Sequence, residues 1–202
     1  MISIRPLATK DFPQVVTFAI EGMHFDRYFQ NPLALRAFGY YFVEHEYANA
    51  TQALGAYEDG RLVGVLFASE TAAPKPHATW PRRLLVASYQ RLMHVFAGQG
   101  TPAYDAANAD MLAAFTAKKA ADGEISLLAT DPMLQGRGIG SQLLAAFART
   151  AKGKRYFLYT DSDCVYQFYD HRGFIREQTR QIELTLGAKQ FPLTCMLYSQ
   201  IF

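Results

Sequence analysis

The chain has 202 residues, 50% of them hydrophobic, and its formal net charge at pH 7 is +2. This composition excludes an intrinsically disordered chain and a broad surface for polyanions such as nucleic acids, while the length suits one domain with a sizeable core. We therefore expect a single domain over residues 1–202 whose partner is a small molecule, not a nucleic acid.

The cysteines and the N-terminal segment bear on the cellular compartment. Cys164 and Cys195 lie far apart without metal-ligand spacing, so we expect free thiols, no disulfide framework and no metal site. Residues 1–6 show no basic segment leading into an apolar region, and no apolar run is long enough to span a bilayer. These features predict a cytoplasmic protein with no membrane partner.

The first seventy residues predict a strand, a helix and a β-hairpin. The strand covers residues 2–5, the helix is capped by Thr9 and ends near Gly22, and the hairpin covers residues 52–58 and 62–69. The strand alternates apolar and polar side chains and stops at Pro6. The hairpin is expected at Asp59-Gly60, a pair that supplies the positive φ values of a tight turn.

Eight aromatic residues lie between positions 25 and 47, with His24 and His45 among them. Phe38, Tyr41, Phe42 and His45 follow one another at helical spacing. Two interpretations remain open. The rings form part of the core, or they line one wall of a pocket for a second substrate.

Residues 71–121 predict a helical insertion in the sheet. Residues 71–81 are rich in Pro, Ala, Lys and Thr and predict a loop. One helical pattern covers 84–96, and a second begins with a cap at Asp105, with residues 98–102 between them. Because the runs before and after both predict strands, we expect these helices to be an insertion that covers the active site.

The stretch 124–144 predicts a strand, a turn and the start of a helix. The glycines at 136, 138 and 140 let the backbone approach a ligand, and the N-terminus of the following helix attracts phosphate. The helix is expected to continue to Gly153. A buried strand at 155–160, a short helix around 165–169 and a hairpin of 174–184 with 191–198 across Gly187-Ala188 follow.

Two nucleotide-binding motifs fit this turn poorly. A P-loop needs Gly-Lys-Ser/Thr, but the sequence here is Gly140-Ser141-Gln142. In a Rossmann fingerprint the third glycine would be residue 141, which is serine, although Asp161 stands where a ribose-binding acid is expected.

Residues 135–140 match Gln-x-x-Gly-x-Gly, which resembles the pyrophosphate-binding motif of the GCN5-related N-acetyltransferase (GNAT) superfamily. Residues 169–174 match Tyr-x-x-x-Gly-Phe, which is similar to a downstream segment of that family. The specific motifs cover 124–174, while the first seventy residues match in pattern only.

The resemblance implies a mixed α/β fold with a central, mostly antiparallel sheet, one parallel strand pair splayed around the cofactor, and helices on both faces. It also implies an acetyltransferase that moves the acetyl group of acetyl-CoA to a primary amine by direct attack. The acceptor would be a small-molecule amine or a peptide, which the sequence does not identify. The oligomeric state stays open, with a homodimer as one alternative.

The resemblance also implies the cofactor contacts. The backbone of the turn would bind the pyrophosphate, through Gln135, Gly136, Arg137, Gly138, Ile139, Gly140 and Ser141. Leu128, Ala129 and Thr130 would pair with the pantetheine arm, and the Leu128 N–H would face the acetyl carbonyl. The Arg137 side chain is either a phosphate contact or a solvated arginine. Ser162 (169 − 7 = 162) departs from an asparagine that contacts the pantetheine in many members.

Two residues are candidates for the proton transfers. By the resemblance, Tyr169 would protonate the departing thiolate, and the alternative is a core tyrosine. Glu124 (135 − 124 = 11 residues before Gln135) has the position of the catalytic glutamate in the histone acetyltransferase branch, and the alternative is a solvent-exposed strand start. Glu70 is a weaker candidate base, and Cys164 has no evident base partner for an acyl-cysteine route.

Two other function classes remain open. A non-catalytic CoA-binding or regulatory module would keep the turn and lack an efficient base, in keeping with the Ser162 departure. A dinucleotide-binding oxidoreductase would bind NAD(P) instead of acetyl-CoA.

Overall fold

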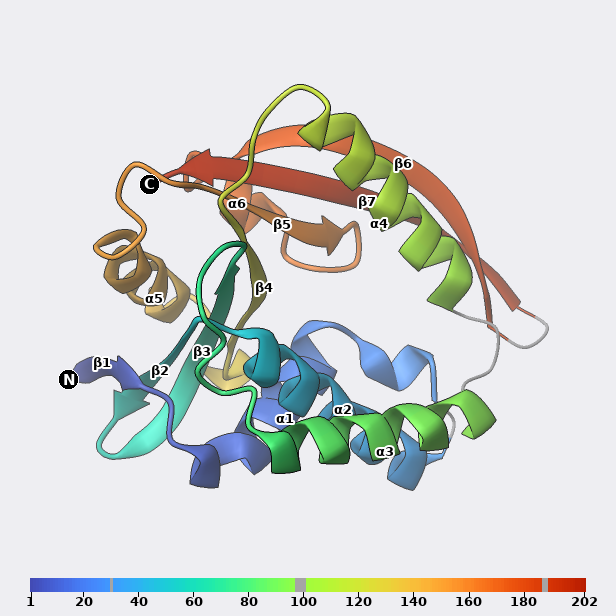
Figure 1. The fold of residues 1–202 in the computed structure, drawn as a ribbon, viewed down its shortest axis with the longest axis horizontal. Helices are drawn as coiled ribbons and strands as arrows, with labels where there is room; N and C mark the ends of the chain where they lie inside the picture. Colours follow the sequence, from blue (N-terminus) through green and yellow to red (C-terminus); the bar gives the residue numbers. More distant parts are fainter. Residues whose placement is uncertain (30, 97–100, 187–188) are drawn as a thin grey trace. The chain divides into compact units, whose positions relative to one another are not determined.

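The computed structural model describes residues 1–29, 31–96, 101–186 and 189–202. Seven strands form one sheet in the order β1-β2-β3-β4-β5-β7-β6 (Figure 1). β4 and β5 pair in parallel, whereas the pairs β1–β2, β2–β3, β5–β7 and β6–β7 are antiparallel. The predicted mixed α/β fold with a mostly antiparallel sheet flanked by helices is confirmed.

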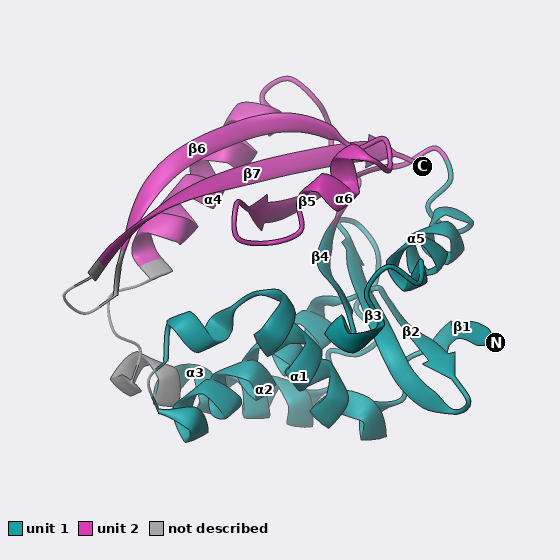
Figure 2. Ribbon diagram, turned by 180° about the vertical axis from the view of Figure 1, so that it is seen from behind, with its two compact units in different colours: residues 1–96, 125–152 teal, residues 97–124, 153–202 magenta. Residues whose placement is uncertain are grey.

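The chain forms two compact units (Figure 2). Unit 1 comprises residues 1–96 and 125–152, and unit 2 comprises residues 97–124 and 153–202. A single domain over 1–202 stays a prediction. Within the described ranges, no helix is both long enough and apolar enough to cross a membrane.

Unit 1 contains the N-terminal half of the sheet and its helices. Its elements are β1 (Ile2–Pro6), α1 (Phe12–Gly22), α2 (Pro32–Asn49), β2 (Gln52–Glu58), β3 (Arg61–Glu70), α3 (Trp80–Phe96), most of β4 (Gly123–Thr130) and α5 (Ile139–Ala148), with short 3₁₀ helices at Thr9–Asp11, Phe25–Arg27 and Pro132–Leu134. One core cluster joins α1 and α2 to β2, β3 and β4.

The aromatic segment contributes mainly to this core. Phe25 and Tyr47 are buried, and Phe38 and Phe42 pack against the cluster while partly buried. The Phe25 ring meets the rings of Phe38 and Phe42 edge-on, with centroids 4.9 and 5.1 Å away. This confirms the core interpretation for these four rings.

The β2–β3 hairpin turns where the sequence predicts. Asp59 and Gly60 have φ values of 50° and 81°, the left-handed region that this turn requires. Farther along β3, a Cβ added to Gly64 would lie 2.8 Å from Cγ2 of Ile139, the first residue of α5. The missing side chain therefore lets α5 pack directly on the face of β3 opposite the core cluster.

Unit 2 contains the C-terminal half of the sheet. Its elements are α4 (Thr101–Thr116), the start of β4, β5 (Arg155–Asp161), α6 (Gln167–Asp170), β6 (Ile175–Leu186) and β7 (Lys189–Ile201). The parallel ladder joins Gly123 to Tyr156 and Glu124 to Phe157. Phe115 of α4 packs against Phe157, with ring centroids 6.1 Å apart.

Several predicted boundaries differ from the structure. α4 begins at Thr101 instead of at a cap on Asp105, because Pro102 fits the first turn of a helix. α5 ends at Ala148, five residues before the predicted end at Gly153. Just after the helix end, the Thr150 hydroxyl donates to the Phe147 carbonyl. The β6–β7 hairpin is confirmed, but its predicted turn at Gly187-Ala188 lies outside the described residues, as do residues 98–100 of the predicted helix break.

Candidate functional site

The turn between β4 and α5 is attached to β3 at its first residue. The Asp131 N–H donates to the Val63 carbonyl at 3.0 Å. The Asp131 carboxylate, only 5% exposed, accepts the Met133 N–H at 3.0 Å and pairs with the Arg61 guanidinium at 2.6 Å. Asp131 is therefore both a helix cap and the buried half of an ion pair, which fixes where the turn leaves the strand.

A second ion pair attaches the middle of the turn to the end of β2. The Arg137 guanidinium contacts both carboxylate oxygens of Glu58, at 2.6 and 2.9 Å. This contact holds the pKa of Glu58 below its ordinary value and raises the pKa of Arg137. The Arg137 side chain is thus paired with a carboxylate, an arrangement that neither sequence interpretation included.

The two pairs together connect the β2–β3 turn to the glycine-rich turn. We call this set of four residues, Glu58, Arg61, Asp131 and Arg137, the hairpin clamp. The β2–β3 turn and the glycine-rich turn each supply one acid and one arginine, so the clamp has no net charge. The Arg137–Glu58 pair is bidentate. It leaves the backbone of the turn, not the Arg137 charge, to face a ligand.

Two of the three predicted glycines have a left-handed backbone, and the third, Gly140, lies in the first turn of α5. Gly136 and Gly138 have φ values of 81° and 72°, and a Cβ at either position would meet no atom within 4 Å. Gly138 caps α5 without a side-chain hydrogen bond, and the Gln142 N–H donates to its carbonyl at 3.1 Å. The N–H groups of residues 139–141 come before that bond and form an open helix N-terminus, which suits phosphate oxygens.

Ser141 adds a polar group to the same helix end. Its Oγ is buried, with no hydrogen-bond partner in the part of the chain that the structure describes. A buried hydroxyl is costly unless it is hydrogen-bonded, so a ligand oxygen at the helix end would satisfy it. The turn and Ser141 therefore fit a pyrophosphate.

The end of β4 alternates between the two faces of the sheet. Ala129 is buried in the core cluster, whereas Leu128 and Thr130 are half-buried on the other face. Thr130 lies on the α5 side, because its Cγ2 would be 3.2 Å from a Cβ at Gly64. These residues lead directly into Asp131 and the turn.

Tyr169 lies on the short helix α6 of unit 2. Its ring is 5.4 Å from the Phe174 ring and 5.8 Å from the Tyr198 ring, centroid to centroid. Burial raises the pKa of Tyr169, with a smaller contribution from Cys164, so the phenol is protonated at neutral pH. The Tyr169 backbone carbonyl accepts the Phe174 N–H at 3.2 Å, so the Tyr-x-x-x-Gly-Phe segment is closed by its own hydrogen bond.

The loop after β5 contains Asp161 and Cys164. The Asp161 carboxylate accepts the N–H groups of Asp163 and Cys164, at 2.9 and 3.2 Å, and is only 9% exposed. Both bonds use Oδ1, and Oδ2 accepts the Tyr104 hydroxyl of α4 at 3.5 Å, so each carboxylate oxygen has a protein partner. Burial and the Asp161 charge raise the pKa of the Cys164 thiol to about 12, which makes it a poor nucleophile at neutral pH.

Ser162 extends the ladder between β5 and β7. Its N–H donates to the Thr194 carbonyl at 2.9 Å, and its Oγ accepts the Thr194 N–H at 3.2 Å. Ser162 is exposed, and its hydroxyl proton is still available to a ligand.

Glu124 is half-buried on β4, opposite Phe157. Burial raises the pKa of Tyr159 on β5, and the negative charge of Glu124 adds a smaller contribution. Glu124 is therefore more enclosed than the solvent-exposed strand start that was its alternative interpretation. Glu70, the weaker candidate, ends β3 in unit 1, where its N–H donates to the Thr51 hydroxyl at 3.1 Å.

Sequence reasoning missed the hairpin clamp. Asp131-Pro132 after a strand is a recognisable capping signal, and it could have identified Asp131. The partners Glu58 and Arg61 carried no such signal, because each pair joins residues at least 70 positions apart.

Comparisons with known proteins agree on one family. Residues 103–176 match the family model of the acetyltransferase (GNAT) domain, and no curated protein matches the chain in sequence. The structure is similar to the histone acetyltransferase HPA2 and related acetyltransferase of Corynebacterium glutamicum, with a TM-score of 0.56 and 22% identity over 97% of this chain and 94% of that one.

Two further solved structures share the fold. The PaiA N-acetyltransferase of Thermoplasma acidophilum, in complex with coenzyme A, has a TM-score of 0.53 and 16% identity over 100% of this chain and 99% of that one. Naa50 of Arabidopsis thaliana, in complex with the bisubstrate analogue CoA-Ac-MVNAL, has a TM-score of 0.50 and 15% identity over 100% of this chain and 99% of that one. The family match over residues 103–176 and the shared fold confirm the predicted resemblance to the GNAT acetyltransferase superfamily.

Proposed function

We propose that the protein transfers the acetyl group of acetyl-CoA to a primary amine. The observation that carries this proposal is the open glycine turn at the N-terminus of α5, with Gly136 and Gly138 at positive φ. The coenzyme A complexes among the proteins of the same fold support acetyl-CoA as the donor. The predicted cytoplasmic location stays an expectation.

Acetyl-CoA supplies the activated thioester, and the chain binds and orients it. The backbone N–H groups of 139–141 and the Ser141 hydroxyl would hold the pyrophosphate, and the hairpin clamp would keep the turn in place. The backbone of Leu128, Ala129 and Thr130 would pair with the pantetheine arm. The Ser162 hydroxyl would donate a hydrogen bond to the same arm. Holding the donor rigidly lowers the entropic part of the barrier.

The proposed reaction is a direct transfer. The amine nitrogen attacks the acetyl carbon, and the Leu128 N–H stabilises the oxyanion that forms. The C–S bond then breaks, the thiolate takes the Tyr169 proton, and the ammonium proton passes to Glu124 or to water. Burial raises the pKa of Tyr169, so the phenol keeps its proton at neutral pH, as the acid role requires. The raised pKa of Cys164 disfavours an acyl-cysteine intermediate.

The acceptor is proposed to be a small-molecule amine or a peptide. The Naa50 complex contains a CoA-peptide analogue, which keeps a peptide among the acceptors worth testing. Release of free thiol from acetyl-CoA, followed with a panel of polyamines, amino acids and peptides, tests the proposal. We expect at least one amine to accelerate release above the rate without acceptor. Binding of acetyl-CoA without turnover for any amine would instead favour the non-catalytic module.

A further inference from the structure

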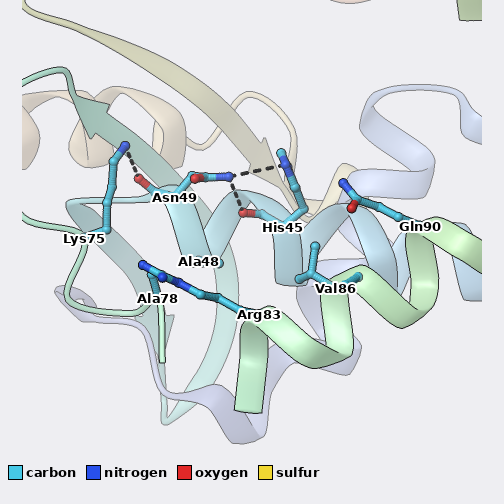
Figure 3. Close-up of a pocket in the computed structure, with 9 residues that line it drawn as sticks. His45, Ala48, Asn49, Lys75, Ala78, Arg83, Val86 and Gln90 are labelled. Atoms are coloured by element: carbon cyan, nitrogen blue, oxygen red, sulfur yellow. Dashed lines mark hydrogen bonds between the residues drawn. The ribbon is translucent and has the colours of Figure 1, made fainter. Parts of the chain in front are cut away.

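A pocket of about 360 Å³ lies within unit 1, between α2, the loop after β3 and the first half of α3 (Figure 3). It is lined by His45, Ala48, Asn49, Lys75, Ala78, Arg83, Val86, Ala87 and Gln90. Six of these nine residues come from the insertion at 71–121, and none belongs to the glycine turn. The volume falls in the range of small-molecule sites, about 300–1,000 Å³.

Neither strong cation of this pocket forms an ion pair with a carboxylate in the part of the chain that the structure describes. Lys75 donates to the backbone carbonyl of Asn49 at 2.8 Å and to the Ser69 hydroxyl, both neutral oxygens. Arg83 makes no ion pair with any described residue. Its neighbour Arg82 provides the contrast, because it pairs with Glu44 at 2.6 Å.

The remaining polar groups complete a hydrogen-bonding wall. His45 and Asn49 lie one helical turn apart on α2, with the Asn49 amide nitrogen 3.3 Å from His45 Nε2 (Figure 3). His45 Nδ1 contacts Glu46, which is outside the lining, at 3.0 Å, and this contact raises the pKa of His45. The Gln90 side chain lines the pocket from α3, and its amide donates to the Tyr41 hydroxyl at 3.3 Å.

The apolar part of the lining is small. Ala48, Ala78, Val86 and Ala87 offer only short aliphatic side chains, so the pocket suits a compact aliphatic body. Lys75 and Arg83 would then meet an anionic head group, while the Asn49 and Gln90 amides, which contact His45 and the Tyr41 hydroxyl, form the wall beside it.

We propose that this pocket binds a small organic anion, with Arg83 and Lys75 holding its carboxylate or phosphate group and the alanines and Val86 contacting a short aliphatic chain. The site is separate from the glycine turn, so it goes beyond the proposed acetyl transfer. It assigns a ligand-binding role to the insertion.

A titration followed by NMR tests the proposal on the full chain without acetyl-CoA. Butyrate and inorganic phosphate are the probes, each at constant ionic strength, and the side-chain amide signals of Asn49 and Gln90 are the reporters. At least one probe should shift these signals saturably. The probe that binds more tightly identifies the head group.

The variants separate this pocket from general charge effects. Arg83→Gln should weaken binding by about tenfold, the loss typical of one charge-assisted hydrogen bond. Arg91→Gln, an exposed position on the same helix outside the lining, should leave the affinity unchanged. Arg83 is exposed, so its replacement should not disturb the fold, and the other backbone signals check this.

Two results would overturn the proposal. One is that neither probe shifts the Asn49 and Gln90 signals saturably, and the other is that Arg83→Gln binds the probe as wild type does. Acetyl-CoA should instead shift the backbone signals of 136–141. A failure of the anion pocket is therefore distinguishable from a failure of the proposed acetyl transfer.

Discussion

At the scale of single residues, Tyr169 is the proposed proton donor. Its phenol is enclosed by the rings of Phe174 and Tyr198, and burial keeps its pKa raised. A core tyrosine would share this packing, so packing alone does not decide between the two interpretations. Kinetics can separate them, because a core role affects stability and an acid role affects turnover.

We predict that Tyr169→Phe lowers kcat by about 100-fold, the lower end of what general acids contribute. The KM for acetyl-CoA and the cofactor-induced thermal shift should stay close to wild type, since the rings still pack. Steady-state kinetics with a working acceptor measure this. Wild-type kcat in this variant would contradict the acid role.

Gly64 shows how a missing side chain positions the turn. An added Cβ would lie 2.8 Å from Ile139 Cγ2 and 3.2 Å from both Leu143 Cδ1 and Thr130 Cγ2. Gly64→Ala should therefore cost about 2 kcal/mol of unfolding free energy, as overpacked cores do. Denaturant unfolding measures it.

Gly22→Ala is the matched control, because its added Cβ would meet only Ala129 Cβ at an ordinary 3.8 Å. The cost of Gly64→Ala should also shrink in an Ile139→Ala background, which removes Cγ2. An equal cost in both backgrounds would mean that α5 does not pack on Gly64 as described.

At the scale of elements, the hairpin clamp joins β2 and β3 to the turn that begins α5. Two roles for Arg137 make opposite predictions. If Arg137 positions the turn through Glu58, removing either partner loosens the turn. If Arg137 binds a phosphate directly, removing Glu58 frees the guanidinium and strengthens binding.

We predict that Glu58→Gln and Arg137→Gln both raise the KM for acetyl-CoA several-fold, with kcat at saturating cofactor near wild type. Tighter binding in Glu58→Gln would reject the positioning role. The pKa of Glu58 is lowered in the folded chain, so the stabilisation by this pair is present above the ordinary carboxyl pKa and is lost as the pH falls through the folded value. The kinetic comparison therefore belongs at neutral pH.

The elements that the sequence predicted well depend on local chemistry. Asp59-Gly60 specifies its hairpin by backbone preference, and Gly136 and Gly138 specify their turn in the same way. The helix starts were less accurate, as at Thr101, because several nearby residues can begin a helix. The hairpin clamp and the pocket of Figure 3 depend on residues distant in sequence, which no local pattern reports.

At the scale of the whole molecule, each residue proposed for acetyl transfer can be assigned to one of the two units. The glycine turn and the strand end 128–130 belong to unit 1, whereas Glu124, Ser162 and Tyr169 belong to unit 2. The proposed phosphate contacts of the turn therefore lie within unit 1 alone. The central claim, that the glycine turn holds acetyl-CoA, can be tested apart from catalysis.

The most direct test is the thermal shift produced by acetyl-CoA. At a concentration of about 100 times Kd, the cofactor should stabilise wild type by about 2.7 kcal/mol, which raises Tm by several degrees. Gly138→Val should abolish this shift, and Gly153→Val should keep it, because Gly153 has a similar φ of 78° and equally open surroundings away from the turn. Gly138→Ala, a smaller change at the same position, replaces Gly138→Val in this test if the valine variant does not fold. An acetyl-CoA shift that is absent in wild type, or undiminished in both Gly138 variants, would contradict the account.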